Sequence, residues 1–406
     1  MPLELLHLLV AAVTLLCCLL TATLFARLPA FKEVVERKGR FGSLDGLRGY
    51  LALGVCIHHF MLTWYLKSEG MWGKAGNPFI NNAGKIGVAL FFMISGFLFI
   101  RKVAFSDQPI DWAKLYRGRF FRIVPLYFFA VLIVFVIAGF KASDSIAADP
   151  ARAFVQAMRW LCFTSGPIGD YWQALLIICG VEWTLRYEWL FYFSLPILQI
   201  WMRLGRVANL VLIGLCVLLF FFPKTLVVFT DLHAWELFEL NFTREKFWEI
   251  FVSFMHTQYL LMFMVGGIAA WLQSRSNVVS GWLQTFPGMG LGTAALVGSW
   301  FYPNTEDFWH MMMVSLFFLT AVHGNQLFGL LKLKGSLVMG EISYSIYLMH
   351  GIVIFLAFST AWSPGKEWTE EQFVWLMPVI GVAVVVVSAA TFLGIERVGM
   401  RIGRRS

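Results

Sequence analysis

Arg48 and His59 share one face of the apolar segment LDGLRGYLALGVCIHHF, residues 44–60. They are eleven residues apart, which is close to three helical turns. Their side chains therefore leave the helix within about 20° of one another and roughly 16 Å apart along its axis, whereas His58 points about 80° away. Ionisable groups at membrane depth are costly and usually lie in a protein interior or a wet cavity, where they act. An imidazole in such a place can take a proton from an attacking hydroxyl, and the alignment favours His59 for that role.

A structural interpretation of this segment stays open. Asp45 and Arg48 stand at its start, where an arginine can extend to the lipid headgroups. Both histidines would then form hydrogen bonds within the protein core. The alignment of Arg48 with His59, together with three further polar segments, favours the chemical interpretation.

A second ionisable group lies in WTLRYEWLFYF, residues 183–193. Arg186 follows Glu182 by four residues, so these two charges can neutralise one another. Glu188 has no such local partner, and we expect its partner on another helix. A carboxylate beside an imidazole fixes the imidazole's tautomer and raises its basicity, as a general base requires. A structural ion pair with a distant arginine is the alternative.

The segment GEISYSIYLMHG sets Ser343, Tyr347 and His350 on one stripe of an otherwise apolar helix. Such a stripe either joins helices or supports a substrate, and both roles stay open. Together with His59 and Glu188, His350 would also suit a metal ion. Because the local spacing typical of metal ligands is missing, we expect no metal.

Two further segments carry groups of chemical interest. LYRGRFFRIVP contains Arg117, Arg119 and Arg122, and guanidinium forks suit phosphate, although plain cytoplasmic anchoring is the alternative. FFMISGFLF places Ser95 and Gly96 in mid-membrane, where a small pair lets helices or a ligand approach closely. A serine nucleophile is disfavoured because the GxSxG context is missing.

The composition assigns the chain to the polytopic membrane proteins. Its 406 residues are 59% hydrophobic and 14% charged, with a mean hydropathy of +0.72. A soluble protein of this length could not bury so much apolar surface. The six cysteines show no CxxC spacing, and we interpret them as small core residues. The remaining histidines have no partner at a readable spacing, and we expect structural roles for them: His7, His233, His256, His310 and His323.

A membrane-spanning helix needs about 20 mostly apolar residues. The first stretch is too long for the apolar core of a signal peptide and lacks a basic leader, so we expect it to be retained. By this criterion the sequence predicts eleven spans: 3–27, 44–66, 84–103, 122–140, 183–202, 207–222, 247–272, 284–302, 308–330, 336–358 and 373–395.

The distribution of Lys and Arg predicts the orientation. With the N-terminus outside and the C-terminus inside, 21 of the 32 basic residues lie on the cytoplasmic side and 10 outside. The net charge of +8 is therefore mostly membrane anchoring, which excludes nucleic acid as a partner. Outside, residues 152–163 predict a helix in the membrane interface, with Arg152, Gln156 and Arg159 on one polar face. Residues 223–246 predict a second polar segment.

These positions suit one reaction. The arginines lie at the cytoplasmic face, and a polar line leads inward from them to a layer of His and Glu nearer the outer face. This arrangement fits a long anionic donor that enters from the cytoplasm and meets an acceptor from outside. Coenzyme A has phosphates for the arginines and a thioester at the end of a thin arm. We therefore expect acyl transfer, with an imidazole drawing the proton from an acceptor hydroxyl.

Five segments, in order across roughly residues 43–395, resemble signatures of the acyltransferase-3 family of membrane acyltransferases. A match to one of these segments alone is weak evidence of membership, whereas matches to five in the same order are specific. The segments are LDGLRG with His59 eleven residues after Arg48, FFMISGFLF, RGRFFRIVPLY, WTLRYEWLFY and GEISYSIYLMH.

The resemblance implies transfer of an acyl group, usually acetyl from acetyl-CoA, to a hydroxyl of an extracytoplasmic glycan or lipid-linked saccharide. It implies that His59 is the catalytic histidine and Glu188 an essential carboxylate. Two features depart from the family: a span before the usual start, and Arg186-Tyr187 where an acidic pair is expected. The donor-binding candidates are Arg48, Arg117, Arg119 and Arg122; the supporting or substrate-facing candidates are Asp45, Ser95, Ser343, Tyr347 and His350.

We thus expect an all-α polytopic membrane protein of a bacterial inner membrane, with acetyl-CoA as donor. A family-like domain at 41–398 would follow an extra helix and linker at 1–40 and precede a basic tail at 399–406. Two other hypotheses stay open. The chain could relay acetyl across the membrane to a partner enzyme, or it could be a proton-coupled transporter, although the internal repeat common in transporters is not evident.

Overall fold

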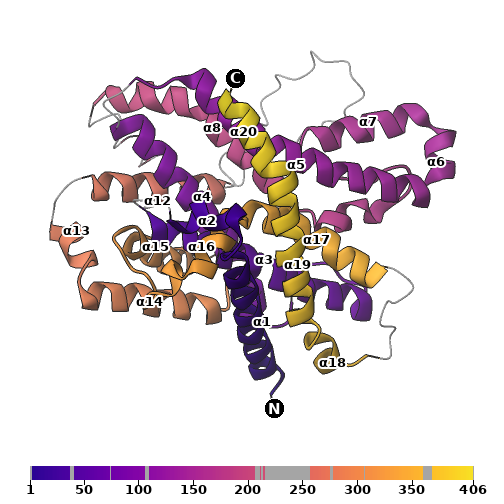
Figure 1. The fold of residues 1–406 in the computed structure, drawn as a ribbon, viewed down its shortest axis with the longest axis horizontal. Coiled ribbons are helices and arrows are strands. Elements are labelled where there is room, and N and C mark those ends of the chain that lie inside the picture. The colour runs from indigo at the N-terminus through magenta and orange to yellow at the C-terminus, as the bar shows by residue number, and fades with distance from the viewer. Residues whose placement is uncertain are drawn as a thin grey trace. The chain divides into compact units, whose positions relative to one another are not determined.

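The described part of the chain is helical throughout (Figure 1). This computed structural model describes residues 2–36, 41–73, 75–105, 109–205, 257–274, 278–305, 307–359 and 368–405, with Val211 and Gly214. Within these ranges one isolated bridge, between Ile168 and Tyr171, is the sole β-type pairing. The prediction of an all-α protein is confirmed.

The helices fall into two compact units, each of which is described by itself. The first unit comprises Met1–Phe91, Ile110–Trp183 and Ser276–Ser406, and the second comprises Phe92–Pro109 and Thr184–Arg275. Helix α4 (Pro78–Phe105) contributes to both. The second unit also holds α8 (Trp183–Arg203), apart from its first residue, and α12 (Thr257–Gln273). The other helices belong to the first unit: α1 (Leu3–Phe25), α2 (Pro29–Glu36), α3 (Gly42–Glu69), α5 (Trp112–Lys141), α6 (Ser143–Ala148), α7 (Pro150–Leu161), η1 (Trp172–Ile178), α13 (Val278–Leu283), α14 (Phe286–Phe301), α15 (Phe308–Val322), η2 (Leu330–Lys332), α16 (Lys334–Glu341), α17 (Ser343–Ser359), α18 (Glu370–Val374), α19 (Met377–Thr391), η3 (Phe392–Glu396) and α20 (Arg397–Arg405).

Among the described residues, four helical stretches are long and apolar enough to cross a membrane: Leu3–Phe25, Pro78–Phe105, Trp112–Lys141 and Glu370–Arg404. A fifth candidate is the pair α16 and α17, which is bent by 72°. These helices indicate an integral membrane protein. The count of eleven spans and the orientation stay predictions.

Two predicted spans differ from the helices, and others lie wholly or partly outside the described residues. Span 308–330 ends as a helix at Val322, because the chain turns through positive φ at Gly324, Leu327, Phe328 and Gly329. Span 336–358 is broken between α16 and α17. Span 207–222, apart from Val211 and Gly214, and the start of 247–272 lie outside the described residues, as do 223–246, Cys216, His233 and His256.

The break between α16 and α17 accompanies an unusually close contact with α3. A Cβ atom on Gly340 would lie 1.7 Å from the Asp45 carbonyl oxygen, and one on Gly46 would lie 1.9 Å from that of Leu331. Only glycine lets the backbones approach so closely. The glycines of LDGLRG and GEISY therefore seat the start of α3 against α16, before α17 sets out in its new direction.

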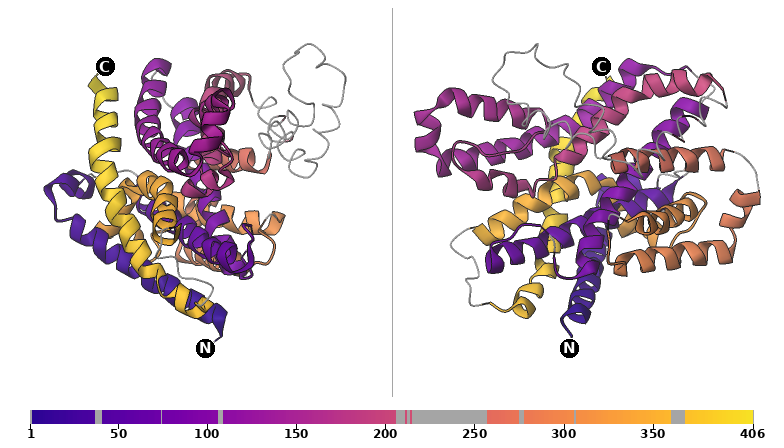
Figure 2. Two further views of the ribbon diagram at one scale, coloured as in Figure 1. Left: turned by 90° about the vertical axis from the view of Figure 1, so that its right-hand side faces the viewer. Right: turned by 180° about the vertical axis from the view of Figure 1, so that it is seen from behind.

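The first helix is packed into its unit along α19, and both views of Figure 2 show the two side by side. His7 on α1 is buried, with Nε2 3.2 Å from Glu370 Oε1 and Nδ1 3.1 Å from Asn77 Nδ2. The sequence analysis found no partner for His7 at a readable spacing, and both partners in the structure, Asn77 and Glu370, are distant in the chain.

The predicted helix at 152–163 corresponds to α7. Gln156 points inward and its Oε1 accepts the Gly169 N–H at 2.8 Å, so it does not belong to an exposed polar face with Arg152 and Arg159. Phe154 is 62% exposed. That exposed apolar side chain supports the interface location, which stays a prediction.

We predict that Gly340→Ala lowers stability, because the added Cβ must push α3 and α16 apart. Overpacking of this kind costs about 1–3 kcal/mol. Gly139→Ala on α5 is the matched control, since no atom lies within 4 Å of its added Cβ and helix propensity favours alanine by up to about 1 kcal/mol. Thermal unfolding of the purified proteins in detergent measures both. Equal melting temperatures would contradict the close contact.

Candidate active site

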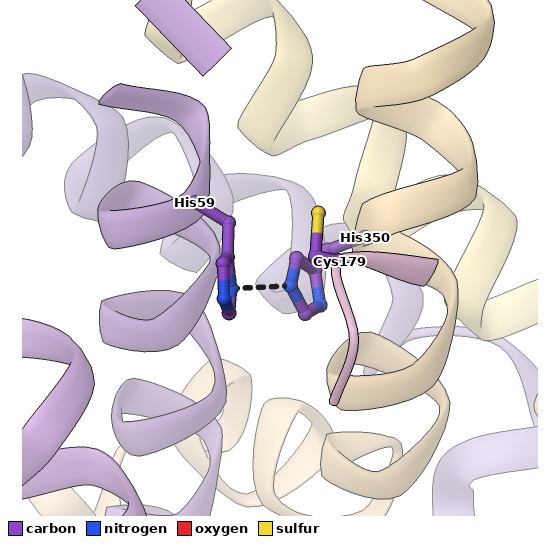
Figure 3. A group of neighbouring side chains, drawn as sticks. All are labelled: His59, Cys179 and His350. Carbon is purple, nitrogen blue, oxygen red and sulfur yellow. Dashed lines mark hydrogen bonds between the residues drawn. The ribbon is translucent and has the colours of Figure 1, made fainter. Parts of the chain in front are cut away.

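The side chains of His59 and His350 meet inside the first unit. His59 comes from α3 and His350 from α17, and His350 Nε2 lies 3.0 Å from His59 Nδ1. Figure 3 shows the two rings facing one another, with centroids 5.1 Å apart. His350 is fully buried and His59 is half-buried. The sequence analysis considered both histidines, with Glu188, as possible ligands of one metal ion, and the fold brings the two histidines into direct contact.

The hydrogen bonds of this pair assign the tautomers. His350 Nδ1 lies 3.2 Å from the Ile346 carbonyl oxygen, which can only accept, so His350 carries its proton on Nδ1. Its Nε2 then accepts, and His59 donates from Nδ1. The remaining nitrogen of His59, Nε2, keeps a lone pair. The chain of bonds therefore prepares His59 to accept a proton.

Neighbouring aromatic side chains hold the two rings. The ring of Trp72 stacks on His59 at 5.9 Å with an interplanar angle of 10°. Tyr347 packs edge-on against His350, and its hydroxyl donates to the Val181 carbonyl at 3.3 Å. The predicted polar stripe of α17 thus contributes two side chains to this site.

His58 has a different role from His59. Its Nδ1 lies 3.0 Å from the Ile80 carbonyl oxygen, and its ring packs on Gly84, where a Cβ would lie 2.7 Å from the ring. His58 therefore joins α3 to α4. The prediction that the two adjacent histidines serve different faces is confirmed.

A cysteine completes the group. Ligand atoms of His59, Cys179 and His350 all lie within 4.8 Å of one another (Figure 3). Within the described ranges this is the one group of three such side chains close enough to share a metal ion, and its nitrogen and sulfur donors suit zinc. Sequence reasoning missed Cys179 and treated it as a core residue; it had considered Glu188 as the third ligand. The expectation of no metal stays a prediction.

A buried carboxylate lies at the other end of the predicted polar line. Glu396 is fully buried, accepts a hydrogen bond from Ser345 at 2.9 Å, and lies 3.9 Å from Arg122 Nε. The charge of Arg48 also acts on it. One of the four predicted donor-side arginines, Arg122, is therefore a direct neighbour of this acid. Sequence reasoning missed Glu396, which lies one residue beyond a predicted span; an ionisable group at such depth was the available signal.

The other predicted site residues of the first unit differ in how far they are buried. Arg117 and Arg119 are half-buried on the first turns of α5. Asp45 is exposed at the start of α3. Ser343 is fully buried at the start of α17, and its Oγ has no hydrogen-bond partner among the described residues.

The second unit holds two predicted residues. Glu188 on α8 accepts a hydrogen bond from the hydroxyl of Tyr192, one turn later. The expectation that its partner lies on another helix was therefore wrong for this bond. Ser95 precedes Gly96, where a Cβ would lie 2.1 Å from the Phe263 carbonyl oxygen of α12. The close helix approach predicted for the Ser-Gly pair is confirmed.

The sequence model of a family described as an acyltransferase domain, acyltransferase-3, matches residues 41–393. The chain belongs to this family. The match covers the His59–His350 pair, Cys179, the α5 arginines and Glu188. The predicted resemblance is confirmed.

Relatives named for acyl transfer are similar to the chain. O-acetyltransferase OatA of Staphylococcus aureus (strain NCTC 8325 / PS 47) is 23% identical over 337 residues, which cover 77% of this chain and 50% of the relative. Acyltransferase MdmB of Streptomyces mycarofaciens is 28% identical over 187 residues, 41% of this chain and 40% of the relative. The chain spans about half the length of the OatA relatives. No solved structure matches.

We predict that Glu396→Gln destabilises the first unit. It keeps the shape and the Ser345 hydrogen bond but removes the negative charge opposite Arg122, which is partly exposed, and loss of such a partner costs about 1–3 kcal/mol. Glu36→Gln is the matched control, because Glu36 pairs with Lys32 at 3.8 Å on an exposed surface, where a pair contributes about 0–1 kcal/mol. Thermal unfolding in detergent compares the melting temperatures of the two variants with that of the parent protein. An equal fall in melting temperature in both variants would contradict a structural role for Glu396.

Proposed function

We propose that the chain is an integral-membrane O-acyltransferase. It moves an acetyl group from cytoplasmic acetyl-CoA to a hydroxyl of an extracytoplasmic cell-surface glycan or lipid-linked saccharide, in a bacterial inner membrane. The observation that carries this proposal is the hydrogen bond between His59 and His350, which leaves one imidazole nitrogen able to accept a proton. Family membership and the names of the relatives support the reaction class.

The chemistry follows from the tautomers. His59 Nε2 takes the proton of the acceptor hydroxyl as its oxygen attacks the thioester carbonyl carbon. The new carbon–oxygen bond forms, the carbon–sulfur bond breaks, and coenzyme A leaves with the proton as a thiol. His350 Nε2 accepts the hydrogen bond from His59 Nδ1–H throughout the reaction. It therefore holds the His59 ring in place and stabilises the positive charge that this ring gains.

The donor would be held by guanidinium groups. Arg48, Arg117, Arg119 and Arg122 are the donor-side residues of this proposal, because planar guanidinium forks match phosphate oxygens. Of these, Arg122 is held 3.9 Å from the buried carboxylate of Glu396. A fixed guanidinium loses less conformational entropy when it binds a phosphate. That pre-organisation supports a role in binding the donor.

The remaining predicted residues have supporting parts in the proposal. Glu188 is its essential carboxylate, and Tyr192 orients it. Tyr347 positions the ring of His350 through their contact. Asp45, Ser95 and Ser343 complete the substrate-facing set, and neither a metal ion nor nucleic acid has a part.

We predict that His59→Gln abolishes acetylation while His58→Gln preserves it. Glutamine at 59 can still donate to His350 but cannot take a proton, and loss of a general base costs about 10²–10⁴-fold in rate. Glutamine at 58 can still donate to the Ile80 carbonyl, so we expect activity within a small factor of the parent. Mass spectrometry of ester-linked acetyl on surface glycans from cells expressing each variant provides the readout.

Detergent-solubilised yield and melting temperature serve as folding controls for the two variants. Normal acetylation by the folded His59→Gln protein would rule out the proposed base. Equal loss in both variants would also contradict it, because a structural defect of the α3 segment would then explain the result.

A further inference from the structure

We propose that Cys179 is a nucleophile that carries the acetyl group as a thioester between donor and acceptor. The inference rests on the proposed function and adds a covalent step to it. It starts from the geometry of the His59–Cys179–His350 group, whose ligand atoms lie within 4.8 Å of one another. A thiol beside an imidazole is the arrangement by which cysteine nucleophiles are activated, and this distance often shortens only when substrate binds.

The backbone at Cys179 is strained. Cys179 has φ 54° and Gly180 has φ 61°, which is the left-handed region. A residue with a Cβ pays about 1–2 kcal/mol there, and glycine or asparagine are the usual occupants. A strained residue that the surroundings hold in place is a common feature of reactive sites. Phe163, Leu327 and Phe328 share this backbone region, so the strain at Cys179 supports the inference through its position beside the histidine pair.

Several contacts fix the turn that carries Cys179. Its N–H donates to the Leu176 carbonyl at 3.0 Å, and the Gly180 N–H donates to that of Leu175 at 2.9 Å. On the other side the turn lies directly on α17, where a Cβ at Gly351 would be 2.8 Å from the nitrogen of Cys179. Gly351 directly follows His350, so one close contact sets the distance between the thiol and the histidine pair.

The Cys179 sulfur is a free thiol next to the histidine pair. Cys179 is buried and forms no disulfide; it is one of five free cysteines in the described part of the chain. Of these five it alone belongs to the histidine group. Figure 3 shows that it comes from the segment after η1, whereas the two histidines come from α3 and α17.

The step balances in two halves. In the first, the pair His59–His350 takes the proton of the Cys179 thiol as the sulfur attacks the acetyl-CoA carbonyl, and the departing coenzyme A thiolate takes that proton. In the second, His59 takes the proton of the acceptor hydroxyl, the oxygen attacks the Cys179 thioester, and the proton returns to the cysteine sulfur. Exchange of one thioester for another conserves the energy of acetyl transfer.

A covalent carrier also solves a geometric problem of the proposed reaction. A donor from the cytoplasm and an acceptor from outside would have to reach one buried site at the same time, which requires openings on both sides of the membrane. An acetyl group stored on Cys179 lets the two substrates bind in turn. Coenzyme A can then leave before the acceptor arrives.

The test uses the full-length protein purified in detergent. It is mixed with acetyl-CoA in the absence of acceptor, quenched in acid and measured by intact mass spectrometry, with peptide mapping and neutral hydroxylamine, which cleaves thioesters. We expect about one acetyl group per chain, on Cys179 and labile to hydroxylamine. Extracted surface glycan should remove it and gain an ester.

Three matched variants complete the test: Cys179→Ala, Cys56→Ala and Cys162→Ala. Cys56 is a buried free cysteine of α3 and Cys162 is an exposed one, so both should keep the label and the rate. Cys179→Ala should lose the label, and its transfer to surface glycan should fall about 100-fold or more. His59→Gln should also lose the label.

The outcomes separate this inference from the proposed function. If the parent protein acetylates glycan but Cys179→Ala does so within about threefold, Cys179 is not the carrier, and the proposed function stands. Acetyl on another residue, or stoichiometric zinc at the group without acetylation of Cys179, would also overturn the inference. If the parent protein acetylates nothing and releases no coenzyme A, the proposed function itself fails. The wild-type labelling requires no variant to fold.

Discussion

The hydrogen bond between His59 and His350 is the interaction on which the site depends. It joins two helices that are far apart in sequence, and it fixes the tautomer of both rings. The start of α3, about four turns before His59, is seated against α16 by glycine contacts such as that of Gly340 with the Asp45 carbonyl. The 72° bend then directs α17 so that His350 faces α3. Close backbone packing and the proposed chemistry are thus parts of one arrangement.

Part of this site follows from local sequence. Helical periodicity placed Arg48 and His59 on one face and separated His58 from His59, because the geometry of a single helix is set by its own residues. The structure agrees: His58 bonds to the backbone of α4, while His59 meets His350. The stripe of α17 was predicted by the same argument, and composition alone predicted an all-helical membrane protein.

The rest depends on contacts that a single sequence does not reveal. Cys179 lies in a strained turn whose approach to α17 depends on Gly351, and neither residue looks unusual in the sequence. Glu396 was hidden at the end of an apolar span, although its charge was a signal. Glu188 found a hydroxyl, Tyr192, on its own helix, because an uncharged partner was not considered.

The state of the two rings provides the most direct test. Solid-state NMR of histidine labelled with nitrogen-15, in lipid vesicles near neutral pH, distinguishes the two tautomers of each ring, and His59→Gln and His350→Gln assign the signals. We predict that His59 is protonated on Nδ1 with a bare Nε2, and that His350→Gln alters the His59 signal. A His59 ring protonated on Nε2, or one insensitive to replacement of His350, would contradict the account.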